Sequence, residues 1–398
     1  MKDETKLVVA GRDPENNHGI VNPPVYHAST VLHPTLAALD DARKRRERGE
    51  RGVFYGRRGT PTTFSLEDMV CAVEGGHRCQ VFPSGLAAIA ASLLSYLKAG
   101  DHVLMSDAVY GPARRFSNGL AARLDIATTF YDPAIGAGIA DLIQDNTRIV
   151  YVEAPGTATF VMQDIPAIAE ATHAAAPASE GGGCVVMMDN TWASPLYCKP
   201  FELGVDVSIQ AGTKYIVGHS DVMIGTACAT KEAWPELEAT SAMLGQTAGP
   251  DDVYLAQRGM RTLSVRLKQH WENGLKLAEW LRGQDMVECV MHPALPDDPG
   301  HALWKRDFLG ASGLFGITLK PCPRGAIAAL VDDLELYGMG ASWGGYESLI
   351  LPTDPNAMRS ITPWPYEGQC MRFHIGLEDP DDLIADLSAG FKRLKAAM

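Results

Sequence analysis

The sequence predicts an α/β protein with a mostly parallel sheet covered by helices on both faces, plus a smaller C-terminal α+β domain. Short apolar runs alternate with stretches of helical periodicity from about residue 61 to residue 250, a pattern typical of βαβ units. Beyond residue 250 a long helical run precedes more widely spaced strands. The chain has 398 residues, of which 46% are hydrophobic, and this is enough for a large packed core.

The predicted elements of the large sheet follow one another at short intervals. Strands are expected at 79–82, 103–105, 126–130, 148–152, 185–188, 207–209 and 223–229, with helices at 85–97, 112–122 and 165–175. The glycine-rich stretch 180–183 predicts a loop rather than a phosphate site, because no helix follows it. In such sheets ligands bind beyond the carboxyl ends of the strands, so functional residues are expected there.

Three segments are predicted along the chain. Residues 1–60 lack sustained periodicity and are rich in Pro, Gly, Asn and Arg, which indicates an extended arm that packs on another body. Residues 61–255 form the predicted large domain and residues 256–398 the smaller one. Helical character is expected over 252–281, followed by strands at 287–291, 314–319 and 371–375 and helices at 326–334 and 381–395.

Composition and charge exclude several classes of protein. The formal net charge is −13, and the dense basic run 43–51 is interrupted by Glu47 and Glu50, so no nucleic-acid partner is expected. No apolar stretch reaches the length of a membrane span, and the N-terminus lacks a signal-peptide core, so we expect a cytoplasmic protein with no membrane partner. The eight cysteines show no metal-ligand spacing, which predicts reduced thiols and no metal site.

Lys214 is the first candidate functional residue. It follows a predicted strand in the stretch SIQAGTKYIVGHSD, residues 208–221. A lysine desolvated at this edge loses its proton more readily and forms an imine with a carbonyl. A solvated lysine at a strand end is the default alternative, so the other strand ends decide between the two.

Three other predicted strands end in residues with matching chemistry. Ser84, Gly85 and Leu86 stand where a strand gives way to a helix, which is an arrangement that binds phosphate, although Ser84 alone is equally well explained as an N-cap. Asp189 ends an apolar strand, and a buried carboxylate needs a cationic partner. Tyr110 follows another strand and has a ring that would cover a flat ligand, although such a tyrosine is more often core.

Together these groups supply what pyridoxal 5′-phosphate requires. They are an imine-forming lysine, an anion for the ring nitrogen, a phosphate-binding site and an aromatic ring that stacks on the cofactor. The carboxylate would keep that nitrogen protonated. A non-catalytic nucleotide-binding module is the alternative of another class. It is disfavoured because G-x-G-x-x-G does not follow the first strand and G-x-x-x-x-G-K-[ST] is absent.

The sequence resembles the cysteine/methionine-metabolism family of pyridoxal-phosphate enzymes, and within it the branch of bacterial cystathionine β-lyases. The resemblance spans nearly the whole chain from residue 20 onward and implies the fold-type I transferase-like architecture. The matching stretches are YGRRGTPTTFSLE (55–67), FPSGLAAIA (82–90), DHVLMSDAVYG (101–111), MDNTWASPL (188–196), SIQAGTKYIVGHSDVMIGTA (208–227), SWGGYESLI (342–350) and MRFHIGLEDPDDLIADL (371–387).

The resemblance implies roles for the residues at the strand ends. Lys214 is similar to the lysine that binds the cofactor and later moves protons, and Asp189 to the partner of the pyridine nitrogen. Tyr110 resembles the ring stacked over the cofactor, and as a phenolate it is the alternative proton acceptor. Gly85 and Leu86 resemble backbone donors to the phosphate.

Further resemblances imply an active site shared between subunits and a residue that binds the substrate. Thr213 would add a hydroxyl to the phosphate, while Tyr55 and Arg57 resemble residues that reach a neighbouring subunit's cofactor, with Tyr55 also on the substrate side. A homo-oligomer is therefore expected, a tetramer built from dimers. Arg372 resembles the residue that binds the substrate α-carboxylate.

Ser342 and Trp343 resemble the substrate-side loop, and a tryptophan there is more similar to β-lyases than to Cγ-acting relatives. Ala211 departs from the serine that many relatives carry three positions before the lysine. The implied activity is β-elimination of the amino acid L-cystathionine to homocysteine, pyruvate and ammonia. The alternatives are a Cγ-acting relative (cystathionine γ-synthase, cystathionine γ-lyase or methionine γ-lyase) and a cysteine-S-conjugate β-lyase.

Overall fold

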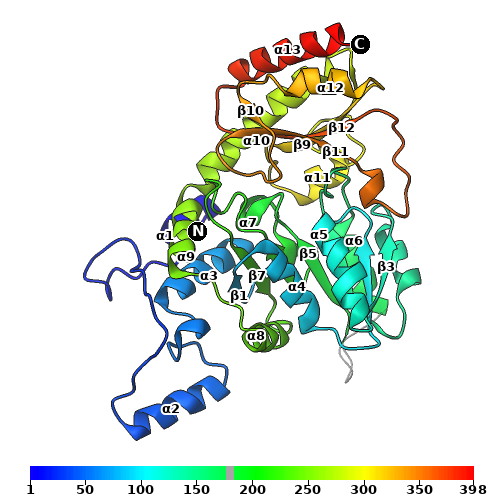
Figure 1. The fold of residues 1–398 in the computed structure, drawn as a ribbon. Helices are drawn as coiled ribbons and strands as arrows, with labels where there is room; N and C mark the ends of the chain where they lie inside the picture. The colour runs from blue at the N-terminus through cyan, green and yellow to red at the C-terminus, as the bar shows by residue number, and fades with distance from the viewer. Residues whose placement is uncertain (176–182) are drawn as a thin grey trace.

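The computed structural model describes residues 1–175 and 183–398, and two sheets organise them (Figure 1). Residues 180–182 of the predicted glycine-rich loop lie outside the described residues. The large sheet has seven strands in the order β1-β7-β6-β5-β4-β2-β3. Its strands are β1 (Arg78–Phe82), β2 (His102–Ser106), β3 (Ala127–Tyr131), β4 (Thr147–Glu153), β5 (Val185–Asp189), β6 (Val207–Gln210) and β7 (Gly225–Ala229).

Most strand pairs of this sheet are parallel, as the sequence predicts. The pairs β2–β3, β2–β4, β4–β5 and β5–β6 are parallel, and β7 runs antiparallel to both β1 and β6. The carboxyl ends of the parallel strands therefore meet at one edge. Helices between and after the strands are α3 (Pro61–Glu74), α4 (Gly85–Ser95), α5 (Gly111–Phe116), α6 (Ile165–Ala175), α7 (Ser194–Tyr197), α8 (Trp234–Met243) and α9 (Pro250–Arg261).

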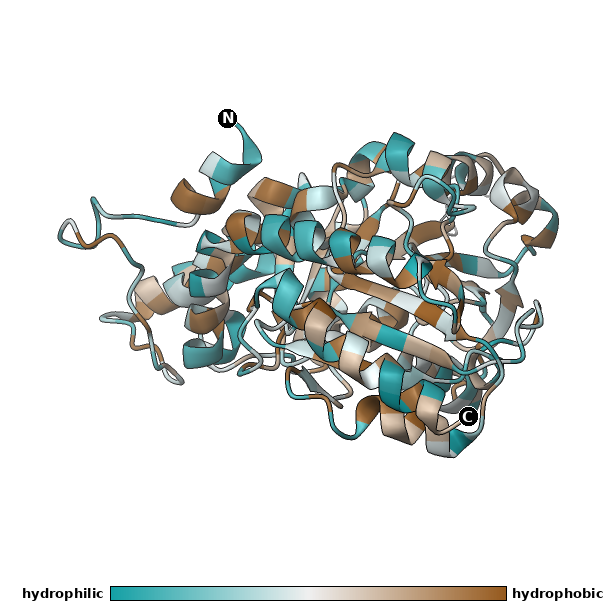
Figure 2. Ribbon diagram, turned by 90° about the horizontal axis from the view of Figure 1, so that it is seen from above, coloured by the Kyte–Doolittle hydropathy of each residue, from teal (hydrophilic) through white to brown (hydrophobic). Residues whose placement is uncertain are grey.

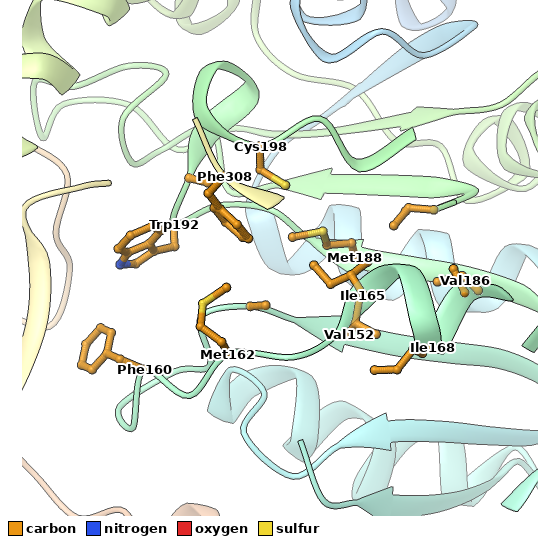
Figure 3. Packing of buried hydrophobic residues seen from close by; sticks show 14 of the residues in the cluster. Val152, Phe160, Met162, Ile165, Ile168, Val186, Met188, Trp192, Cys198 and Phe308 are labelled. Carbon is orange, nitrogen blue, oxygen red and sulfur yellow. The ribbon is translucent and has the colours of Figure 1, made fainter. Parts of the chain in front are cut away.

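Both faces of the large sheet are buried, which explains why its strands read as continuous apolar runs. Met105 and Met187 point into a core shared with α4 and α8, whereas Leu104, Val186 and Met188 point into a second core with α6. The alternation follows the two-residue period of a strand. Figure 3 shows part of the second core, in which Ile165 and Ile168 of α6 pack beside Val152, Val186 and Met188.

The second, smaller domain is built on a five-stranded sheet. Its order is β10-β11-β12-β9-β8, with antiparallel pairs except for β10–β11. The strands are β8 (Val287–Met291), β9 (Leu314–Leu319), β10 (Tyr337–Gly338), β11 (Ser348–Thr353) and β12 (Cys370–His374). The helices are α10 (Leu263–Arg282), α11 (His301–Asp307), α12 (Arg324–Val331) and α13 (Pro380–Ala396).

Figure 2 shows hydrophobic residues, in brown, concentrated on inner strands and hydrophilic residues, in teal, on outer helix faces.

The predicted helical run over 252–281 is two helices rather than one. α9 ends at Arg261 and α10 begins at Leu263. At Gly259 an added Cβ would lie 2.3 Å from the carbonyl oxygen of Ile216, so the chain after Lys214 presses against the helix there. Arg266 donates to the Gly259 carbonyl oxygen at 2.8 Å, and this oxygen also accepts from the Thr262 nitrogen at 3.1 Å. The predicted domain boundary at 255/256 falls inside α9.

The N-terminal segment differs from a uniformly extended arm. Helix α1 (Asp3–Val9) packs on the body, with Leu7 fully buried and Arg261 donating to the carbonyl oxygens of Leu7 and Ala10 at 2.9 and 2.8 Å. Helix α2 (Leu36–Glu47) has no buried residue and projects away from both sheets (Figure 1). Among the described residues no helix has the length and apolar character needed to cross a membrane.

Candidate active site

The four strand ends predicted from sequence meet at the carboxyl edge of the large sheet. Asp189 is the last residue of β5 and is paired with Ile209 of β6. Ile209 in turn precedes Lys214 by five positions. Ser84 follows β1, and Tyr110 follows β2. The fold therefore brings residues that are distant in sequence to one edge, as expected for a parallel sheet.

Lys214 is held in contact with the small domain. Its Nζ lies 2.6 Å from the Oγ of Ser342 and 5.3 Å from the centroid of the Trp343 ring. Burial, followed by the charge of Arg372, lowers the pKa of Lys214 to about 8, and the charge of Asp189 opposes this shift. The amine therefore loses its proton more readily than an ordinary lysine, as predicted from its place in the sequence.

Asp189 is buried and keeps one carboxylate oxygen free. Thr191 donates to Oδ1 from its backbone nitrogen at 3.0 Å and from its hydroxyl at 2.5 Å, and Oδ2 bonds to no described residue. Burial raises the pKa of Asp189, which means that a cation beside Oδ2 would be favourable. The hydroxyl of Thr191 also accepts from the Ala211 nitrogen at 2.8 Å, so the end of β5 is tied to the turn before Lys214.

The start of α4 approaches that turn closely. Ser84 Oγ accepts from the Ala87 nitrogen at 3.1 Å, so Ser84 is the N-cap of α4. An added Cβ on Gly85 would lie 2.6 Å from the Cβ of Ala211, so this approach requires glycine. The N–H groups of the first turn, including those of Gly85 and Leu86, have no partner within the helix and are oriented for an anion.

Thr213 holds the turn before Lys214. Its hydroxyl accepts from the Ile224 nitrogen at 2.9 Å and donates to the Ile224 carbonyl oxygen at 3.1 Å. These bonds fix Thr213 between the carboxyl end of β6 and the start of β7. Its role toward a phosphate stays a prediction.

Tyr110 is half-exposed and is held by a residue that sequence analysis missed. Its backbone nitrogen donates to Oε2 of Glu153 at 2.7 Å. Burial, then the charge of Asp189, raises the pKa of Tyr110 above its ordinary value. These surroundings favour the neutral phenol, and the role of Tyr110 as an alternative proton acceptor stays a prediction.

Glu153 ends β4 in register with Asp189 of β5. Burial, then the charge of Asp189, raises its pKa to about 8. Its other oxygen accepts from the Thr157 hydroxyl. A search of every strand end for a carboxylate would have identified this residue, because it directly follows the predicted strand 148–152.

Arg372 lies on β12 and fixes the loop that carries Ser342 and Trp343. Its Nη2 donates to the carbonyl oxygens of Gly340, Ala341 and Ser342 at 3.2, 3.1 and 3.0 Å. The pKa of Lys214 is lowered by the charge of Arg372. The structure thus brings Arg372, Ser342 and Trp343 to Lys214, as predicted, and carboxylate binding by Arg372 stays a prediction.

Tyr55 and Arg57 are placed elsewhere in the same chain. Arg57 donates to the Ala242 carbonyl oxygen at 3.0 Å, and Tyr55 OH lies 3.5 Å from Ser29 Oγ. Both line a pocket of about 370 Å³ formed with Tyr26, Ala28, Ser29 and residues 247–250, to which none of the four strand ends contributes. Within one chain they do not belong to the Lys214 site.

Metal binding finds no support in residues 1–175 and 183–398. No group of three or more His, Cys, Asp or Glu side chains in these ranges is placed to hold an ion. All eight cysteines are free thiols.

A lysine of lowered pKa and a buried aspartate at neighbouring strand ends of such a sheet define a pyridoxal-phosphate-dependent enzyme of fold type I. The model of the family described as Cys/Met metabolism PLP-dependent enzyme matches residues 4–392, and the chain belongs to this family.

Characterised relatives are similar over nearly the whole chain. Cystathionine beta-lyase of Salmonella typhimurium is 45% identical, over 98% of each chain. L-alanine/L-glutamate racemase of Wolbachia pipientis is 40% identical, over 99% of this chain and 98% of the relative. The structure of cystathionine gamma synthase from Xanthomonas oryzae with aminoacrylate and cysteine has a TM-score of 0.89, 31% identity and full coverage of both chains.

The residues present fit pyridoxal phosphate. The free Oδ2 of Asp189 suits a protonated ring nitrogen, the amine of Lys214 suits an aldehyde, and the first turn of α4 beside Gly85 suits a phosphate. These three groups converge at the same edge of the sheet.

Proposed function

We propose that this protein catalyses β-elimination of L-cystathionine to homocysteine, pyruvate and ammonia. The observation that carries the proposal is the placement of Trp343 and Ser342 against the Nζ of Lys214, at 5.3 and 2.6 Å. The identity with the beta-lyase of Salmonella typhimurium supports it.

Each residue has a task in this reaction. Arg372 binds the substrate carboxylate with its planar guanidinium and so orients the Cα–H bond. The neutral amine of Lys214 accepts the Cα proton, and Ser342 holds Nζ in place for this transfer. The cofactor, when bound, supplies an electron sink for the charge left at Cα.

The remaining steps break the bond to sulfur. The Cβ–S bond breaks, and the ammonium of Lys214 returns its proton to the departing sulfur of homocysteine. Water then hydrolyses the released enamine to pyruvate and ammonia, so atoms and protons balance. A Cγ-acting relative must also remove a proton from Cβ and yields 2-oxobutyrate, while a racemase returns the proton to Cα and releases no keto acid.

The keto acid formed from L-cystathionine therefore tests the proposal. Pyruvate is expected, formed in equal amount with homocysteine. 2-Oxobutyrate, or a D-amino acid without keto acid, would assign a different reaction. Smaller cysteine conjugates are expected to give pyruvate as well, because elimination requires only a leaving group on Cβ.

We infer that the active site is shared between subunits of a homo-oligomer, a tetramer built from dimers. Tyr55 and Arg57 lie in the projecting segment, where Tyr55 is 45% exposed and neither residue contacts Lys214 of its own chain. They would reach the cofactor phosphate of the partner. We also propose a cytoplasmic location, which the free thiols favour, and a boundary between the two domains near α9.

A further inference from the structure

The loop 339–347 connects β10 to β11 and carries Ser342 and Trp343. Two side chains of β12 hold it, and they lie two residues apart on the same face of that strand. Arg372 binds carbonyl oxygens in the first half of the loop, as described above. His374 binds the second half, through Nε2 at 3.0 Å from the Gly345 carbonyl oxygen.

The hydrogen bond fixes the state of the His374 ring. A carbonyl oxygen only accepts, so Nε2 carries the hydrogen and Nδ1 of the neutral ring carries none. His374 is fully buried, and Nδ1 bonds to no described residue. Burial, and the cations Arg372 and Lys214, lower its pKa to about 4. His374 therefore remains a neutral donor at neutral pH.

A row of rings connects His374 to the reactive amine. The ring centroid of His374 lies 5.9 Å from that of Tyr215, and the Tyr215 centroid lies 5.4 Å from that of Trp343. The Trp343 ring in turn lies 5.3 Å from the Nζ of Lys214. Tyr215 is fully buried and follows Lys214 directly. Displacement of the His374 ring would reach Trp343 through both the loop and Tyr215.

We propose that His374 is a positioning residue that sets Trp343 beside Lys214 and so shapes the substrate side of the site. It touches the loop and Tyr215, and it acts on the substrate through them. The choice of substrate rests on the proposed function, whereas the placement of Trp343 does not.

Two variants separate the hydrogen bond from the volume of the ring. His374→Leu removes the donor, and His374→Gln keeps an N–H near the position of Nε2. With L-cystathionine we expect His374→Leu to raise KM about 10-fold, the equivalent of one hydrogen bond of about 1.4 kcal/mol. The kcat should change about 2-fold or less, and His374→Gln should restore most of the KM.

A fluorescence measurement tests the placement without catalysis. The emission of Trp343 is obtained by subtracting the spectrum of the same protein carrying Trp343→Phe. In His374→Leu this emission should become more accessible to acrylamide than in the wild type or in His374→Gln. The control is His292→Leu, another fully buried histidine, which packs on Trp192 and Phe315 and should leave both readouts unchanged.

Unchanged quenching and KM in a folded His374→Leu protein would overturn the proposal, as would equal defects in the Leu and Gln variants. Should leucine prevent folding, His374→Ser removes the same donor with less volume and takes its place. If the wild type forms no keto acid, the proposed function fails, and the quenching still decides on His374.

Discussion

Lys214 and Ser342 form a hydrogen bond of 2.6 Å that joins the end of β6 in the large domain to a loop of the small domain. The amine that is to bind the cofactor is thus oriented by a residue 128 positions away in sequence. Trp343, which follows Ser342, lies over the same amine. The substrate-side loop and the reactive lysine consequently form one structural unit.

The lowered pKa of Lys214 predicts how the cofactor-free protein captures pyridoxal phosphate. Only the neutral amine attacks an aldehyde, and a pKa of about 8 means that its neutral fraction rises with pH up to that value. The capture rate should therefore rise about 10-fold per pH unit below pH 8 and level off above it. Stopped-flow absorbance measures this rate, with Lys214→Ala as the control that shows no capture. A rate independent of pH between 6 and about 8 would contradict the assignment.

Asp189→Asn should stabilise the cofactor-free protein and lower the activity of the loaded enzyme. The amide keeps an oxygen for the Thr191 nitrogen and removes a buried charge whose pKa is raised by burial. We expect the cofactor-free variant to gain about 1 kcal/mol in the free energy of unfolding, while kcat of the loaded enzyme falls about 100-fold. Denaturant unfolding and steady-state kinetics measure the two effects.

The matched control for this substitution is Asp107→Asn. Asp107 is also fully buried, but it pairs with Arg114 at 2.6 Å and its pKa is lowered. The same change should there reduce the free energy of unfolding. Equal signs at the two positions would show that the environment of Asp189 is not as described.

Glu153 should act through the backbone of Tyr110. Glu153→Gln keeps an oxygen that can accept from the Tyr110 nitrogen, whereas Glu153→Leu leaves that N–H without its partner at 2.7 Å. We expect a loss of about 10-fold in kcat/KM for Leu and a much smaller loss for Gln. Circular dichroism of the cofactor band reports ring placement independently. Equal losses for both variants would indicate that the charge, not the hydrogen bond, matters.

A shared active site predicts complementation between two defective chains. Chains with Lys214→Ala and chains with Arg57→Ala should each be impaired, and their mixed dimers should contain one intact site. Random mixing should therefore restore about one quarter of wild-type activity. Co-expression with two different affinity tags isolates the mixed dimer. A mixed dimer no more active than its better parent would place Arg57 outside the partner's site.

The sequence predicts the parts of this fold in which local pattern and burial agree. Lys214 and Asp189 were identifiable because each polar residue ends or follows an apolar strand, and parallel strands end at one edge. The same logic should have yielded Glu153, which ends β4.

Other features depend on tertiary contacts that no local pattern encodes. The seven-residue α1 is stabilised by burial of Leu7 and by Arg261, which lies 254 positions away from it. Close to the break at Thr262, the carbonyl oxygens of Ile216 and Val217 leave no room for a Cβ on Gly259. Ser342 and Trp343 lie in a loop without periodicity, so that family resemblance alone indicated their role.

Covalent mapping of the cofactor identifies the lysine that binds it. Borohydride reduction of the purified, pyridoxal-phosphate-loaded protein fixes the cofactor to the amine that holds it, and peptide mass spectrometry locates the modified lysine. We expect one modified residue per chain, Lys214, with the modification abolished in Lys214→Ala. Modification of a different lysine, or stoichiometric modification that persists in Lys214→Ala, would contradict it.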